Sequence, residues 1–215
     1  MFNNCDQKTN GEEAFYKKIR ERIRVVFDVG CRSDSLFTEF EGEVHYFDPM
    51  PAFIENLKMQ PNQNKTAVFN TFGLGDANKE VFYYPKYESF CDRTVSCTVS
   101  DDANKVLLRM KRGADCVGDL QGIDFLKIDT EGFELNVLQG FGDFLEKIKI
   151  IQFEYGGTYL DNNVKLIDVV KYLEDHGFHQ FSYLTHEGPI LIKDFSDHYA
   201  YCNVVCVHKS SDILF

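Results

Sequence analysis

Residues 124–140 constrain the fold more than any other part of the sequence, because two structural periods meet there. The first six residues, DFLKID, alternate apolar and polar side chains as a β-strand does, whereas Phe133, Val137 and Phe141 follow helical spacing. Gly132 stands between the two patterns. We therefore predict a strand, a tight turn and a helix. In a mainly parallel sheet, such a turn lies at the carboxyl edge, where ligands bind.

Four ionisable residues, Lys127, Asp129, Glu131 and Glu134, crowd this predicted edge. Like charges held close together shift one another's pKa, as working acids and bases require, so the pattern favours a functional site. Lys127 either lowers the pKa of a neighbouring carboxylate, binds an anionic acceptor or points to solvent. Glu134 either contacts substrate or accepts hydrogen bonds from the loop backbone.

Other predicted strands also end in acids. Residues 25–29 form an apolar run that holds Asp28 and is followed by Gly30, a residue that lets backbone approach a ligand closely. Residues 44–47 end at Asp48, about 20 residues later, which is the separation expected for an acid that binds ribose. A third strand, 66–72, runs into two glycines and Asp76, and a fifth, 148–155, holds Glu154.

The run FLKIDTEGFELNVLQGF, together with VVFDVG at 25–30 and FDP at 47–49, resembles the FkbM family of S-adenosylmethionine-dependent methyltransferases over about residues 25–208. The resemblance implies a single-domain α/β fold, a doubly wound Rossmann-like seven-stranded mixed sheet whose last strand is antiparallel. One departure is visible. The chain reads GCRSDS from residue 30, so only Gly30 matches the glycines usual after the first strand.

The resemblance also implies how the cofactor, S-adenosylmethionine, is bound. The loop after the first strand faces its methionine part, Asp48 binds its ribose while Pro49 fixes the turn, and the turn near residue 75 contacts its adenine. The cofactor-binding residues implied in this way are Asp28, Val29, Gly30, Cys31, Asp48, Pro49, Leu74, Gly75, Asp76 and Asp129.

Transfer of a methyl group to a hydroxyl needs aligned reactants and removal of a proton. We expect Asp129 to contact the cofactor amine or the acceptor hydroxyl, Glu131 and Glu154 to be candidate general bases, and Lys127 to assist. The same three carboxylates could bind Mg²⁺, although no spacing demands a metal. The six histidines show no metal-binding pattern.

The composition predicts one domain, residues 25–215, after an N-terminal helical extension, residues 1–24, whose helix lies against the sheet edge. The formal net charge of −11 argues against nucleic acid as a partner. The chain shows neither an apolar run long enough to span a membrane nor a signal-like N-terminus, so we expect a cytoplasmic protein with reduced cysteines.

The remaining elements are assigned by periodicity. We predict a short helix over 102–113, a helix over 164–176, and strands over 178–184 and 203–207. Residues 85–102 form a long polar insertion that could cover the active site.

The function expected from these features is O-methylation of a hydroxyl, in a sugar of a glycan or glycan precursor. The alternatives are methylation of a non-sugar small molecule and a non-catalytic methyltransferase-like binding module. A nicotinamide-dependent enzyme would also use Asp48, but it would have the full glycine fingerprint, which this chain lacks. The acceptor and the oligomeric state are not determined by the sequence.

Overall fold

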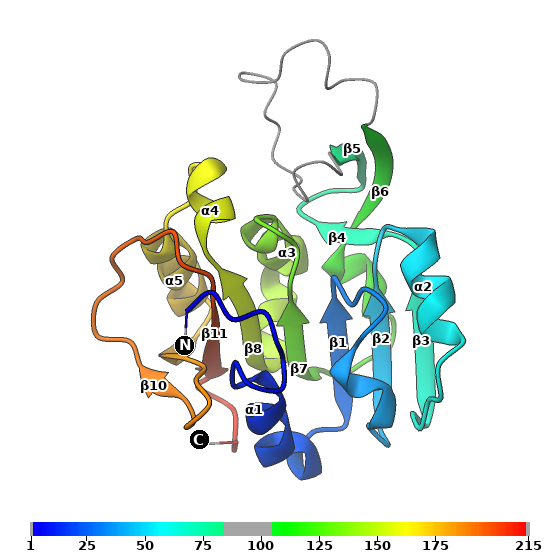
Figure 1. Ribbon diagram of the computed structural model, residues 1–215, viewed down its shortest axis with the longest axis horizontal. Coiled ribbons are helices and arrows are strands. Elements are labelled where there is room, and N and C mark those ends of the chain that lie inside the picture. Colours follow the sequence, from blue (N-terminus) through cyan, green and yellow to red (C-terminus); the bar gives the residue numbers. More distant parts are fainter. Residues whose placement is uncertain (1, 84–104, 214–215) are drawn as a thin grey trace.

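The computed structural model of the protein describes residues 2–83 and 105–213, and its main element is a mixed sheet flanked by helices (Figure 1). The strands of this sheet are β1 Val25–Val29, β2 Glu43–Phe47, β3 Thr66–Asn70, β7 Ile123–Ile128, β8 Ile148–Tyr155, β9 Phe178–Tyr183, β10 Ile190–Leu191 and β11 Cys202–His208. The helices are α1 Glu12–Ile19, α2 Pro51–Lys58, α3 Glu134–Phe141, α4 Gly157–Asp161 and α5 Leu166–Asp175.

The strand order is β10-β9-β11-β8-β7-β1-β2-β3, and the five strands from β8 to β3 run parallel. β11 is antiparallel to both β8 and β9, as expected for the terminal strand. The chain first builds outward from β1 through β2 to β3 and later returns to β7 on the other side of β1. The boundary between β1 and β7 is thus the topological switch point, where α/β proteins bind ligands at the carboxyl ends of strands.

The two faces of the sheet are covered by different helices. Phe27, Leu126 and Phe153 belong to a core shared with α3 and α5, whereas Val26, Phe125 and Ile150 belong to a second core shared with α1 and α2. Since successive side chains of a strand point to opposite faces, Asp28, Lys127 and Glu154 lie on the α1 side. On this face, apolar side chains occupy the amino-terminal halves of the strands and polar ones the carboxyl ends.

A second, three-stranded sheet lies beyond the carboxyl ends of the main sheet (Figure 1). Its order is β4-β6-β5, formed by β4 Gly73–Gly75, β5 Lys79–Tyr83 and β6 Val106–Arg112. β4 occupies the position where the sequence suggested only a turn.

Three expectations about the fold are wrong in detail. The main sheet has eight strands within the described residues rather than seven, because the two-residue strand β10 pairs with β9. The helix expected over 102–113 is absent where the chain is described, since β6 occupies 106–112, where Leu108 and Met110 are buried and Leu107 and Arg109 are exposed. α1 packs on the face of the sheet through Phe15 and Ile19, not along its edge. The insertion at 85–102 lies outside the described residues.

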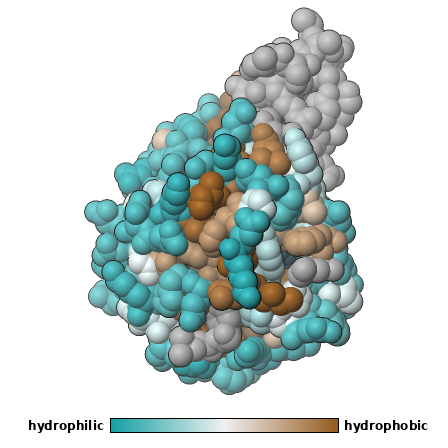
Figure 2. All heavy atoms as spheres, turned by 90° about the vertical axis from the view of Figure 1, so that its left-hand side faces the viewer, coloured by the Kyte–Doolittle hydropathy of each residue, from teal (hydrophilic) through white to brown (hydrophobic). Residues whose placement is uncertain are grey.

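The side of the molecule that carries β10 is mostly hydrophilic, with separate hydrophobic side chains between the polar ones (Figure 2). Ile190 and Leu191 of β10 are about half exposed. In the described part of the chain, no helix is long and apolar enough to cross a bilayer.

Candidate active site

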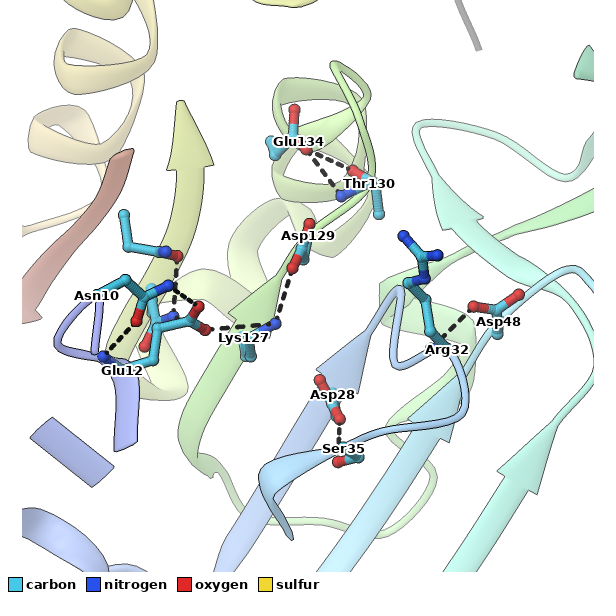
Figure 3. A network of polar contacts seen from close by, with 12 residues as sticks. Asn10, Glu12, Asp28, Arg32, Ser35, Asp48, Lys127, Asp129, Thr130 and Glu134 are labelled. Atoms are coloured by element: carbon cyan, nitrogen blue, oxygen red, sulfur yellow. Dashed lines mark hydrogen bonds and ion pairs between the residues drawn. The ribbon is translucent and has the colours of Figure 1, made fainter. Parts of the chain in front are cut away.

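The turn after β7 is held in shape by Glu134, the first residue of α3. Its Oε1 accepts hydrogen bonds from the backbone N–H of Thr130 at 2.8 Å and from the Thr130 hydroxyl at 3.0 Å (Figure 3). It also accepts one from the N–H of Gly132 at 3.3 Å. Of the two roles considered for Glu134, the structure shows the backbone one. Glu131, at the apex of this turn, has a positive φ of 56°, a strained conformation for a side chain of its size.

The tips of β1 and β7 approach each other at Gly30. A Cβ at this position would lie 1.8 Å from the carbonyl oxygen of Asp129, and the φ of Gly30 is 79°, so only glycine fits. Beside it, Asp28 is 1% exposed. Its Oδ2 accepts a hydrogen bond of 2.5 Å from Ser35, whereas its Oδ1 has no partner among the described residues. Burial raises the pKa of Asp28 to about 6.

A first cavity of about 260 Å³ opens at the tips of β1, β2 and β7. Asp48 lies on its wall, where its two oxygens accept hydrogen bonds from the N–H groups of Arg32 at 3.0 Å and Met50 at 2.8 Å. Burial raises the pKa of Asp48, and these two bonds oppose the rise. The residues lining this cavity are Val29, Gly30, Arg32, Asp48, Pro49, Met50, Phe53, Gly73, Leu74, Tyr83, Leu108, Met110, Asp129, Thr130 and Glu131.

A second, more polar cavity of about 380 Å³ adjoins the first on the α1 side of the sheet, and we call it the acidic chamber. The two cavities share Gly30, Arg32, Asp129 and Glu131. The other residues lining the acidic chamber are Cys5, Gln7, Asn10, Glu12, Asp28, Cys31, Asp34, Ser35, Leu36, Lys127, Glu154 and Asn203.

Lys127 is the buried cation of this chamber. It is 4% exposed, its Nζ lies 3.0 Å from Asp129 and 3.6 Å from Glu12 (Figure 3), and it does not point to solvent. Burial alone would lower its pKa, but Asp129, Glu12 and Asp28 together raise it well above the usual value. Glu12 is fixed in turn by the side-chain amides of Asn10 at 2.7 Å and Gln152 at 2.8 Å.

Glu154 at the end of β8 faces three other carboxylates. Burial, followed by the charges of Asp129, Glu131 and Glu134, raises its pKa to about 10. Glu154 thus keeps its proton at neutral pH in the ligand-free protein, which favours Asp129 and Glu131 as general bases. One ligand atom of each of Asp129, Glu131 and Glu154 lies within 4.8 Å of the others.

The structure brings most of the predicted site residues to these two cavities. Val29, Gly30, Asp48, Pro49, Leu74 and Asp129 line the first cavity, and Asp28, Gly30, Cys31, Lys127, Asp129, Glu131 and Glu154 line the acidic chamber. Gly75 and Asp76 line neither. Gly75 packs on Phe133, and Asp76 pairs with Lys79 at 2.7 Å, so their contact with adenine stays a prediction.

Several lining residues were not anticipated. Glu12 and Asn10 reach the acidic chamber from the N-terminal segment, and Tyr83 and Met110 reach the first cavity from the small sheet. Glu12 lies more than 110 positions before its partners Lys127 and Gln152. No local pattern marks residues so distant from the motifs they meet.

Two adjoining cavities thus lie at the switch point of the parallel strands, one apolar with an acid placed as for ribose binding and one rich in carboxylates. Such an arrangement is typical of cofactor-dependent α/β enzymes. A family model described as the methyltransferase FkbM domain matches residues 28–179. The chain therefore belongs to the FkbM methyltransferase family.

Solved structures agree with this fold. Methyltransferase FkbM from Methylobacillus flagellatus KT superposes with a TM-score of 0.50 at 16% identity, over 85% of this chain and 43% of that one. A TehB-like SAM-dependent methyltransferase from Corynebacterium glutamicum ATCC 13032 gives a TM-score of 0.51 at 9% identity, over 93% and 88% of the two chains. The chain thus spans less than half of the M. flagellatus protein. No curated protein sequence matches the chain significantly.

Proposed function

We propose that the protein transfers the methyl group of S-adenosylmethionine to a hydroxyl group of a sugar, in a glycan or a glycan precursor. The observation that carries this proposal is the polar acidic chamber that opens beside the first cavity and shares Asp129 and Glu131 with it. Since each reactant needs its own compartment and the reacting atoms must meet, shared residues mark the meeting point.

The residues of the first cavity fit the cofactor. Asp48 is available to the ribose hydroxyls, and Phe53, Leu74 and Met110 offer apolar surface to a flat base. The assignment of Asp48 follows the role that the family resemblance implies for it.

Glu131 is our proposed general base. It lines both cavities, and its positive φ holds its backbone in a strained conformation of the kind that clusters at functional sites. Bound S-adenosylmethionine supplies an electrophilic methyl group: the acceptor oxygen bonds to it, the carbon–sulfur bond breaks with its electron pair kept by sulfur, and the hydroxyl proton passes to Glu131. Asp129 and Lys127 fix the polar wall beside this position.

The acceptor class follows from the character of the chamber. Its wall carries the carboxylates of Glu12, Asp34 and Glu154 beside those already named, together with the amides of Gln7, Asn10 and Asn203. Carboxylates repel anionic acceptors, whereas carboxylates and amides together accept and donate hydrogen bonds to a polyhydroxyl compound. A neutral sugar is therefore favoured over a phosphorylated or carboxylated one.

The test is a methyl-transfer assay on a panel of sugar nucleotides, free oligosaccharides and phenolic compounds, read by formation of S-adenosylhomocysteine. We expect turnover with a neutral sugar hydroxyl, and a loss of about 10²- to 10⁴-fold in kcat in Glu131→Gln. The exposed Glu174→Gln variant in α5 is the matched control. Turnover confined to phenols, or full activity in Glu131→Gln, would contradict the proposal.

A further inference from the structure

We propose that the acidic chamber binds one divalent metal ion, with Asp129, Glu131 and Glu154 as its protein ligands. The inference rests on the proposed function for its role, since the ion would hold the acceptor sugar. Among the described residues, these three form the one group of acidic, histidine or cysteine side chains with the proximity that a metal ion needs.

The geometry of the group fits a single ion. The three ligand atoms lie within 4.8 Å of one another. Metal–oxygen bonds of about 2.1 Å for Mg²⁺ and about 2.4 Å for Ca²⁺ place two ligands of one ion at most about 4.2 to 4.8 Å apart. The ligands come from the tip of β7, the turn that follows it and the tip of β8, and β7 and β8 are paired neighbours in the sheet. Carboxylate oxygens are the hard ligands that Mg²⁺, Ca²⁺ and Mn²⁺ prefer.

A second observation points to a ligand in the same chamber. Asp28 lines it, is almost fully buried, and has an Oδ1 without a hydrogen-bond partner. In Figure 3 this oxygen points away from Ser35, toward the side of Lys127 and Asp129. An ion with three protein ligands keeps several bound waters, and such waters are donors that a buried carboxylate oxygen can accept.

The charge of the chamber favours a divalent ion over an organic ammonium group. Lys127 is paired with both Asp129 and Glu12, so one ammonium group already serves two carboxylates of the chamber. A monovalent cation bound in the chamber would neutralise less of its negative charge than a divalent cation would.

A metal ion at this position would add a substrate preference to the proposed function. Two adjacent hydroxyl groups of a sugar would fill two of its open positions, which orients one oxygen toward the first cavity and lowers the pKa of that hydroxyl. Glu131 would give one oxygen to the ion and keep the other for the hydroxyl proton. The substrate class then narrows to sugars with a free vicinal diol.

The test uses Mn²⁺ as a paramagnetic probe on the full chain with saturating S-adenosylhomocysteine, whose binding is measured by calorimetry on the same samples. Electron paramagnetic resonance reports the loss of the free Mn²⁺ signal. We expect one Mn²⁺ per chain, displaced by millimolar Mg²⁺, and an affinity at least about 10-fold weaker in Glu154→Gln, with the exposed Glu174→Gln as control.

The outcomes separate the two proposals. Binding of S-adenosylhomocysteine without stoichiometric Mn²⁺ binding overturns the metal site and leaves the proposed function standing, as does Mn²⁺ binding that Glu154→Gln does not weaken. If S-adenosylhomocysteine itself does not bind, the proposed function fails, and Mn²⁺ binding that depends on Glu154 would then support the site without its role.

Discussion

The free energy of unfolding should report directly on Glu134, since this carboxyl group is 1% exposed and its Oε2 has no partner among the described residues. Burial raises its pKa from 4.5 to about 7, against the hydrogen bonds that its Oε1 accepts. The folded state therefore binds the proton more tightly than the unfolded chain does. The resulting stability is fully present below pH 4.5 and is lost as the pH rises through about 7.

The magnitude follows from the shift. A change of one pKa unit corresponds to about 1.36 kcal/mol, so ionisation of Glu134 costs the folded state about 3 kcal/mol above pH 7. Glutamine at this position keeps the Oε1 acceptor and does not titrate. Its second N–H lacks a partner, which costs about 1–3 kcal/mol at every pH. The difference in stability between Glu134→Gln and the wild type should thus shift by about 3 kcal/mol in favour of the variant between pH 4.5 and 8.

The assay is urea unfolding at several pH values from 4.5 to 8, followed by far-UV circular dichroism because the chain has no tryptophan. The exposed Glu174→Gln variant is the control for removing one carboxylate. A difference between Glu134→Gln and wild type that stays constant within about 0.5 kcal/mol across this range would refute the reasoning, since it would mean that water reaches Oε2.

Three other perturbations follow from the same geometry. Gly30→Ala should lower the free energy of unfolding by more than about 3 kcal/mol, because its Cβ would overlap the Asp129 carbonyl. Gly118→Ala, which also has a positive φ but nothing within 4 Å, should cost only about 1 kcal/mol; equal losses in urea unfolding would contradict the overlap. Asp48→Asn should weaken S-adenosylhomocysteine at least about 10-fold by calorimetry with little loss of stability, since the asparagine oxygen can still accept one of the two loop N–H groups; unchanged affinity would rule out the ribose role. Lys127→Met should cost about 3–5 kcal/mol, and adding Glu12→Gln should restore part of it; no restoration would show that the two residues are not coupled.

The parts of the fold that the sequence predicted are those whose signal is local. β1, β2 and β8 are apolar runs buried on both faces, and the change of period at Gly132 coincides with the turn between β7 and α3. The proximity of Asp129 and Glu154 was also predictable from the sequence, because the carboxyl ends of neighbouring parallel strands lie at one edge of the sheet.

The parts that the sequence did not predict depend on distant partners. In β6, Leu107 and Leu108 are adjacent, and together with the basic residues after them they fit a helical face as well as a strand; pairing with β4 and β5 decides between the two. The burial of Lys127 depends on Glu12, which is far away in the chain and carries no motif. β10 is two residues long, too short for any periodic signal.

The raised pKa values show that the carboxyl groups at the carboxyl edge of the sheet are unfavourably buried when they are ionised. Burial is the main cause for Asp28, Glu134 and Glu154, whose pKa values reach about 6, about 7 and about 10. Apolar residues of similar size would make the same edge more stable, since removing buried charges is often neutral or stabilising. Lys127 offsets the rise for Asp28 and Glu154, but it is already paired with Asp129 and Glu12. An edge that lowers the stability of the ligand-free protein is best explained by the ligands that it binds, because a cation or a hydrogen-bond donor in the chamber stabilises the ionised carboxylates that burial alone disfavours.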